Sequence, residues 1–235
     1  MKHTLLIKDW LSSFLSLLFP RCCVVCGRPL AKGEECICTV CNINLPRTNY
    51  HLRKDNPVER LFWGQIPLER ATSFFFYEKG SDFRLILHRL KYGGQKEIGA
   101  IMGRYMAAEL LSSHFFQGID VIIPIPLHKK KQQIRGYNQS EWIARGIAVV
   151  TGIPIDTESI LRKKNTETQT RKSVFERRDN VEGIFELQHP ETLAGKHILI
   201  VDDVLTTGST TLACASCLVD VEDIRISILT LAMVE

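Results

Sequence analysis

The sequence lacks any apolar run long enough to cross a membrane. Its most apolar early stretch, residues 11–19, has only about nine residues, whereas a bilayer-spanning helix needs about 20. No small-x-small cleavage site precedes the first cysteines, although a secretory signal peptide stays open as an alternative. We therefore expect a cytoplasmic protein whose first residues form an amphipathic helix.

A strong charge of either sign is also absent. The formal net charge is +4 over 235 residues, of which 45% are hydrophobic and 24% are charged. This composition is typical of a globular protein and does not by itself indicate a nucleic-acid ligand. The length suits one medium-sized α/β domain with a small additional module.

Cysteine is scarce outside one short segment, because six of the eight cysteines lie between residues 22 and 41. A disulfide framework would distribute them along the chain, so the clustering favours metal binding in a reducing compartment. Two Cys-x-x-Cys pairs, Cys23 with Cys26 and Cys38 with Cys41, are separated by eleven residues. Together they can complete a tetrahedral, four-thiolate zinc site of the structural kind.

Other interpretations of these cysteines stay open. Cys22 or Cys36 could replace a neighbouring ligand, since each lies close to one of the pairs. Free or disulfide-paired cysteines are a second alternative. An iron–sulfur cluster fits less well, because the segment has no Cys-x-x-Cys-x-x-Cys run.

The stretch 196–212 joins an apolar strand to acids and a loop of small residues. Residues 198–201 are apolar and rich in β-branched side chains, which predicts a strand buried on both faces of a parallel sheet. Asp202 and Asp203 follow. The loop and the start of a helix then supply Thr206, Thr207, Gly208, Ser209 and Thr210.

This order of residues favours a ribose phosphate. Ligands of parallel sheets bind just beyond the carboxyl ends of the strands. Backbone N–H groups at a helix N-terminus hold phosphate, and carboxylates suit ribose hydroxyls or Mg²⁺. The alternative is an ordinary strand–loop–helix corner with two solvated acids.

Residues 202–210 resemble the phosphoribosyl-pyrophosphate (PRPP) motif of type I phosphoribosyltransferases. In that family the two acids contact the ribose diol, and the following loop surrounds the 5′-phosphate. The resemblance implies these roles for Asp202 and Asp203 and for residues 206–210.

A second apolar stretch, residues 119–126, runs into a basic segment without acids. We expect a cationic loop that binds pyrophosphate, because charge-assisted bonds to phosphate are strong. A solvated charged loop is the alternative. The residues concerned are His128, Lys129, Lys130, Lys131 and Arg135, followed by Tyr137, Asn138 and Gln139.

Residues 162–180 carry seven basic and three acidic side chains. Such a segment beside a phosphate site could close over it as a lid and exclude water. Its candidate residues are Gln169, Thr170, Arg171 and Arg177. A loop without a role in binding is the alternative.

Periodicity and turn residues predict an α/β fold. We expect residues 1–50 to form an N-terminal helix and zinc module, 51–67 a linker, and 68–235 the main domain, with 42–67 irregular. The strands are expected at 70–77, 119–126, 155–161, 183–187, 198–201 and 224–234, and the helices at 81–92, 96–113, 138–150 and 210–219.

Taken together, these features resemble the ComF family. The resemblance rests on the cysteine pairs after an apolar N-terminal segment, residues 90–93, 124–127 and 135–139, Gln169 and Thr170 with Arg177 and Asn180, and the PRPP motif. It implies a four-cysteine zinc-ribbon module on a type I phosphoribosyltransferase fold, with a mostly parallel sheet flanked by helices. It also implies a link to DNA uptake in naturally competent bacteria.

Three functions follow from this resemblance. The first is transfer of phosphoribosyl from Mg²⁺-PRPP to an unknown acceptor, in which Asp202 and Asp203 would be catalytic by stabilising positive charge at C1′. A glutamine-dependent version is not expected, because it needs a mature N-terminal Cys and here Met1 is followed by Lys2. The second is a non-catalytic competence factor that binds single-stranded DNA, with Tyr137 as a stacking ring, or helicase-type proteins. The third is a PRPP-binding regulator.

Overall fold

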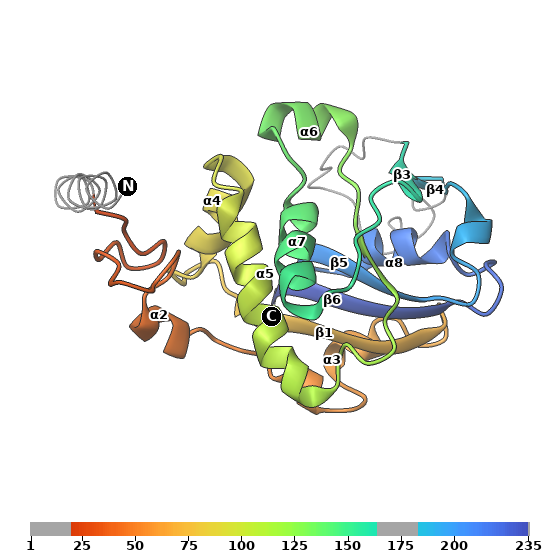
Figure 1. Cartoon of the computed structure of the whole chain (residues 1–235), viewed down its shortest axis with the longest axis horizontal. Coiled ribbons are helices and arrows are strands. Elements are labelled where there is room, and N and C mark those ends of the chain that lie inside the picture. Colours follow the sequence, from red (N-terminus) through yellow and green to blue (C-terminus); the bar gives the residue numbers. More distant parts are fainter. Residues whose placement is uncertain (1–19, 164–182, 235) are drawn as a thin grey trace, which may run out of the picture.

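The chain alternates strands and helices around one central sheet (Figure 1). A computed structural model describes residues 20–163 and 183–234. The strands are β1 (Leu68–Tyr77), β2 (Val121–Pro124), β3 (Ile160–Arg162), β4 (Phe185–Leu187), β5 (His197–Leu205) and β6 (Arg225–Val234). The α-helices are α2 (Thr39–Ile43), α3 (Pro57–Arg60), α4 (Arg84–Tyr92), α5 (Glu97–Leu110), α6 (Lys129–Arg135), α7 (Gln139–Thr151) and α8 (Ser209–Ser216). The 3-10 helices are η1 (Tyr50–Leu52), η2 (Leu111–Ser113) and η4 (Pro190–Thr192).

The central sheet has four strands in the order β1-β6-β5-β2, and every neighbouring pair is parallel. A separate antiparallel ribbon joins β3 to β4. The apolar run of β5 lies between β2 and β6 in the sheet. Its residues are buried, as a strand covered on both faces requires. The prediction of a parallel central sheet flanked by helices is confirmed.

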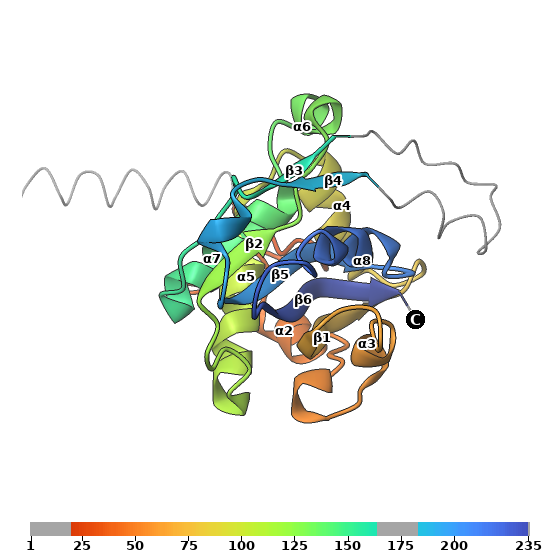
Figure 2. The same cartoon turned by 90° about the vertical axis from the view of Figure 1, so that its right-hand side faces the viewer.

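Successive residues of β5 point into two different cores, because side chains alternate across a strand. Leu199 and Val201 belong to the core formed with α4, α5 and α7. Ile198 and Ile200 belong to the core formed with α8 and the segment around α3. Figure 2 shows α8 and the helix pair α5–α7 on opposite sides of the sheet.

The cysteine segment packs directly on α5 rather than standing apart from the sheet. Ile37 lies in the same buried cluster as Met102 and Met106. The Nε atom of Arg47 forms an ion pair with Oε2 of Glu109 at 2.6 Å, and Arg104 pairs with Glu35. The expected division of the chain into domains stays a prediction.

The stretch 42–67 is more ordered than the loop or linker expected. It contains α3, whose first turn is capped by the side chain of Asn56 in a capping box with Glu59. Val58 and Phe62 are fully buried. The polar residues and prolines of this stretch therefore mark turns around a helix that packs against β1.

The basic segment after β2 was expected to be a loop, and that expectation is wrong. Lys129–Arg135 form α6. His128 caps the helix by accepting a hydrogen bond from the backbone N–H of Lys130 at 3.2 Å, and Gly136 ends it at a φ of 80°. Lys, Gln and Arg favour helix, so a capped run of them forms one despite its charge.

Most other expected elements are present with shifted ends. The helix expected at 81–92 begins only at Arg84. The strand expected at 155–161 is confined to Ile160–Arg162, and Ile155 makes only an isolated bridge to Ile122. The N-terminal amphipathic helix and the lid residues Gln169, Thr170, Arg171 and Arg177 lie outside the described residues. None of the helices within residues 20–163 and 183–234 has the length and hydropathy needed to cross a membrane.

The contact between α5 and α7 depends on two glycines. A Cβ atom on Gly103 would clash with the carbonyl oxygen of Ile143, and one on Gly146 would clash with the carbonyl oxygen of Ala100. The two helix backbones therefore touch directly. Because α7 carries residues of the candidate site at its N-terminus, this contact fixes the position of those residues relative to the sheet.

We expect Gly103→Ala to lower the free energy of unfolding by about 2 kcal/mol or more, because overpacking forces the two backbones apart. Chemical denaturation measures the change. Gly80→Ala is the matched control, since a Cβ there meets no atom within 4 Å. Equal stability of the two variants would contradict the close helix contact.

Candidate functional site

Four cysteines meet in the N-terminal module. The Sγ atoms of Cys23, Cys26, Cys38 and Cys41 all lie within 4.8 Å of one another. The backbone N–H of Cys38 donates to Sγ of Cys23 at 3.3 Å, and that of Cys41 donates to Sγ of Cys38 at 3.4 Å. Such N–H donors stabilise thiolates, and the set of four fits a tetrahedral metal ion.

The two remaining cysteines of the segment lie elsewhere. Cys22 is exposed, and its thiol contacts the carbonyl oxygen of Pro20 at 3.4 Å. Cys36 is buried with its sulfur 3.9 Å from that of Met102, and burial raises its pKa. The structure therefore assembles the two Cys-x-x-Cys pairs and leaves Cys22 and Cys36 outside the cluster.

The sequence suggested that Asp202 and Asp203 follow the strand. In the structure they lie within β5. The strand keeps pairing with β6 as far as Leu205. Its pairing with β2 stops earlier, at Val201 opposite Pro124. Prolines at residues 124 and 126 lack the N–H needed to continue the ladder. The two acids therefore lie where one neighbouring strand has ended and the other has not.

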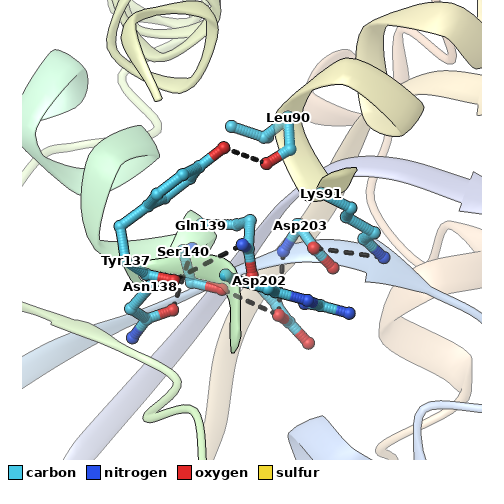
Figure 3. Close-up of polar contacts among 9 residues, drawn as sticks. Leu90, Lys91, Tyr137, Asn138, Gln139, Ser140, Asp202 and Asp203 are labelled. Atoms are coloured by element: carbon cyan, nitrogen blue, oxygen red, sulfur yellow. Dashed lines mark hydrogen bonds and ion pairs between the residues drawn. The ribbon is translucent and has the colours of Figure 1, made fainter. Parts of the chain in front are cut away.

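Each acid has a different set of partners (Figure 3). Oδ1 of Asp202 accepts the Ser140 hydroxyl at 3.0 Å and the backbone N–H of Asp203 at 2.8 Å. Oδ2 of Asp203 pairs with Nζ of Lys91 at 3.1 Å. Burial, followed by the charge of Asp203, raises the pKa of Asp202 to about 7. The pair thus presents one salt-bridged carboxylate and one that holds a proton up to neutral pH.

The loop after β5 leads into α8 at Gly208. This glycine has a φ of 75°, a conformation that favours glycine, and a Cβ on it would contact the Phe62 ring at 3.4 Å. The hydroxyls of Thr207 and Ser209 are 2.8 Å apart. No side chain caps α8, so its first backbone N–H groups keep no capping partner within the described chain. Together with exposed Thr206 and Thr210, they form a suitable phosphate-binding turn.

Lys131 of α6 interacts with the charges of three other cations. Burial lowers the pKa of Lys131, and the charges of Arg162, Arg135 and Lys91 lower it further. These four cations, Lys91, Lys131, Arg135 and Arg162, are named the cationic cluster below. Lys129 and Lys130 are exposed on α6, and His128 acts as its cap.

Tyr137, Asn138 and Gln139 hold the segment between α6 and α7 in place. The Tyr137 hydroxyl donates to the Leu90 carbonyl, and Asn138 both caps α7 and donates to the Ile125 carbonyl at 3.0 Å. Gln139 accepts from Arg135 at 2.8 Å. Tyr137 is buried, so its ring is not available as a stacking surface.

Three site residues were not identified from the sequence. Lys91 lies in the family phrase at residues 90–93 and Arg162 in the basic segment, but the sequence pattern assigns neither of them, nor Ser140, to the site. Arg162 lies over the Phe185 ring at 5.2 Å, and the charge of Asp202 partly offsets the lowering of its pKa by burial. Nothing in the local sequence of these residues indicates that three separate elements converge on β5.

The raised pKa of Asp202 predicts a pH-dependent stability. The folded state keeps this proton up to about pH 7, whereas the unfolded chain loses it near about pH 4. Wild-type stability therefore falls as the pH rises through this window, by up to about 1.4 kcal/mol per pH unit. Asp202→Asn carries no such titration, so we expect it to gain stability relative to wild type.

Denaturation of both proteins at about pH 5 and about pH 7, without Mg²⁺ or phosphate, measures this difference. Comparing the two proteins cancels the shared titration of the cysteines and histidines. Parallel stability curves across the window would contradict the raised pKa.

Comparisons with known proteins agree with the family resemblance of the sequence motifs. No family model matches the chain. The chain is similar to DNA utilization protein YhgH of Escherichia coli O157:H7, with 32% identity over 83% of this chain and 88% of that protein. It is 26% identical to competence protein ComFC of Bacillus subtilis over 90% of this chain and 83% of that protein.

Two further matches add a second competence protein and a solved structure. Competence protein F of Haemophilus influenzae is 32% identical over 54% of this chain and 57% of that protein. Among solved structures, the adenine phosphoribosyltransferase of Leishmania tarentolae covers 80% of this chain and 94% of its own, at 12% identity and a TM-score of 0.38. The extent and identity of the match to the E. coli protein are decisive, and the chain belongs to the ComF family.

Proposed function

We propose that the chain binds PRPP together with Mg²⁺ at the carboxyl ends of β5 and β2, and that it transfers phosphoribosyl to an acceptor. One observation carries the proposal. Asp202 and Asp203 directly precede a phosphate-binding turn at residues 206–210, and they interact with two members of the cationic cluster: Lys91 pairs with Asp203, and the charge of Asp202 acts on Arg162. A ribose with a phosphate at one end and a diphosphate at the other has one group for each of these three parts.

The turn before α8 suits the 5′-phosphate. The helix N-terminus supplies backbone N–H donors, and the threonine and serine hydroxyls supply further ones. The fully buried ring of Phe62 packs against Gly208 on the side of the core. The phosphate would therefore rest on a turn that cannot move away from it into the core.

The two acids suit the ribose hydroxyls. Both can accept hydrogen bonds from a diol, and their negative charge can stabilise positive charge that develops at C1′. Mg²⁺, bound with the diphosphate, would neutralise part of the negative charge of the leaving group. The positive charge of Mg²⁺ would also favour the ionised form of Asp202, which stays protonated up to about pH 7 in the free protein.

The cationic cluster suits the departing diphosphate. The charges of Arg162, Arg135 and Lys91 lower the pKa of Lys131, so these like charges disfavour one another until an anion lies among them. Arg135 is also held in place, because it bonds to Gln139 and lies over the Tyr92 ring at 5.5 Å. A preorganised cluster stabilises charge on a leaving group without further rearrangement.

The names of the relatives favour a role in DNA utilisation or competence. A non-catalytic factor that binds single-stranded DNA is the second candidate, supported by the exposed lysines Lys129 and Lys130 on α6. Such a surface would bind through charge and lose affinity as salt rises. Because Tyr137 is buried, its ring is not available for stacking on a base.

Isothermal titration of the zinc-loaded protein with PRPP and Mg²⁺ tests the first candidate. We expect saturable binding, and a loss of affinity of about tenfold or more in Asp203→Ala, because a charged hydrogen-bond partner of the ribose is removed. A parallel titration with single-stranded DNA separates the candidates, since Asp203→Ala leaves an electrostatic surface intact. Absence of heat with PRPP in wild type would rule out the PRPP site.

We also propose that Cys23, Cys26, Cys38 and Cys41 bind a structural zinc ion. The four thiols fit the tetrahedral donor set. Arg28 lowers the pKa of Cys26 to about 6, through its backbone N–H and then its side chain, whereas burial and the neighbouring thiols raise the pKa of Cys41. Zinc would hold together a short module whose two cysteine pairs come from separate turns.

Metal analysis of the purified protein checks this proposal. We expect about one zinc per chain in wild type and a large loss of zinc and of thermal stability in Cys38→Ser, because three thiolates leave the tetrahedron incomplete. Cys22→Ser is the matched control, since Cys22 lies in the same segment but outside the cluster. Loss of zinc in both variants alike would contradict the assignment.

A further inference from the structure

The last turn of α4 makes three contacts with the candidate site through three consecutive residues. The Leu90 carbonyl accepts the Tyr137 hydroxyl, Lys91 pairs with Asp203, and the Tyr92 ring lies under the Arg135 guanidinium. Figure 3 shows the first two contacts side by side. This turn is therefore fixed both to β5 and to the segment that links α6 to α7.

Lys91 occupies the middle of this turn, between the acids and the cations. Its ion pair with Asp203 is largely shielded from water, with side-chain exposures of 23% and 13%. At the same time its charge acts on Lys131 and on Asp202. An ammonium group has three donors, and the 3.1 Å contact with Asp203 uses one of them.

Building on the proposed PRPP site, we propose that Lys91 is a diphosphate-binding residue that couples the leaving group to the ribose-binding acid. One of its N–H groups holds Asp203 in position, and another donates to a phosphate oxygen in the cationic cluster. Lys91 thereby joins the two halves of the ligand through a single side chain. Neither the PRPP motif nor the basic segment contains this residue.

The proposal predicts which half of the ligand loses affinity when Lys91 is changed. If Lys91 contacts the diphosphate, its removal weakens PRPP and inorganic pyrophosphate together and affects ribose 5-phosphate much less. If Lys91 only positions Asp203, its removal weakens PRPP and ribose 5-phosphate together and leaves pyrophosphate unchanged. The three probes therefore separate a binding role from a purely positioning one.

The experiment titrates PRPP, inorganic pyrophosphate and ribose 5-phosphate, each with Mg²⁺, into the full-length, zinc-loaded protein. We expect Lys91→Met to lose about tenfold or more in affinity for PRPP and pyrophosphate, the size of one charged hydrogen bond. Lys91→Gln keeps a donor for Asp203 without the charge, so it protects the fold and should show the same loss for pyrophosphate. Lys91→Arg keeps the charge and should restore part of the affinity.

Lys196→Met is the matched control, because it removes the same charge at the opposite end of β5, about 20 Å from Asp203 at the usual rise per residue. It should bind all three probes as wild type does. Pyrophosphate affinity unchanged in both Lys91→Met and Lys91→Gln would overturn the proposal while leaving the PRPP site in place. Failure of wild type to bind PRPP would overturn both.

Discussion

The site depends on how two adjacent carboxylates are kept on a strand in the middle of a sheet. Burial disfavours charge, and two neighbouring negative charges disfavour each other. The structure accommodates them differently: Asp203 is paired with Lys91, whereas Asp202 accepts hydrogen bonds from the neutral Ser140 hydroxyl and a backbone N–H. Burial and the neighbouring charge of Asp203 raise the pKa of Asp202 despite these two donors. A multivalent anion with its metal ion would supply charges that the free protein lacks.

The loops around the two acids are held in place by interactions of uncharged side chains that do not contact the acids themselves. Asn138 joins the start of α7 to the end of the β2 region, Tyr137 joins it to α4, and Phe62 supports the turn before α8. These residues need not contact a ligand to matter, because they fix the relative positions of three loops. Residues 135–139 thus serve mainly as a joint between α4, α6 and α7, with Arg135 as their charged contribution.

The sequence predicted the parts of the fold that depend on local patterns. The apolar run at 198–201, the paired acids and the cysteine spacing each reflect a local requirement, and the structure has the strand and the four-cysteine cluster where they were expected. The basic segment forms a helix instead of the expected loop, because the helix preference of Lys, Gln and Arg outweighs the repulsion between their charges. Lys91, Ser140 and Arg162 could not be found in this way, since their approach to β5 is set by packing across distant segments.

The contact of α5 with α7 shows the same limit. Gly103 and Gly146 lie far apart in the sequence, and only the folded structure reveals that each leaves room for a carbonyl oxygen of the other helix. The positions of α7 and of Ser140 follow from that contact. A substitution at either glycine would therefore act on the site through geometry alone.

The strand order has a consequence for folding of the protein during its synthesis. β6 is the last described strand along the chain, yet it lies between β1 and β5. On the ribosome, β1 and β5 emerge before β6, the strand that pairs with both. Until β6 is available, β1 and β5 lack this pairing and their apolar side chains stay incompletely buried. Long-range parallel pairing of this kind forms slowly and exposes apolar surface in the meantime. The acids on β5 can therefore take up their final positions only after β6 has been synthesised and has paired with β5.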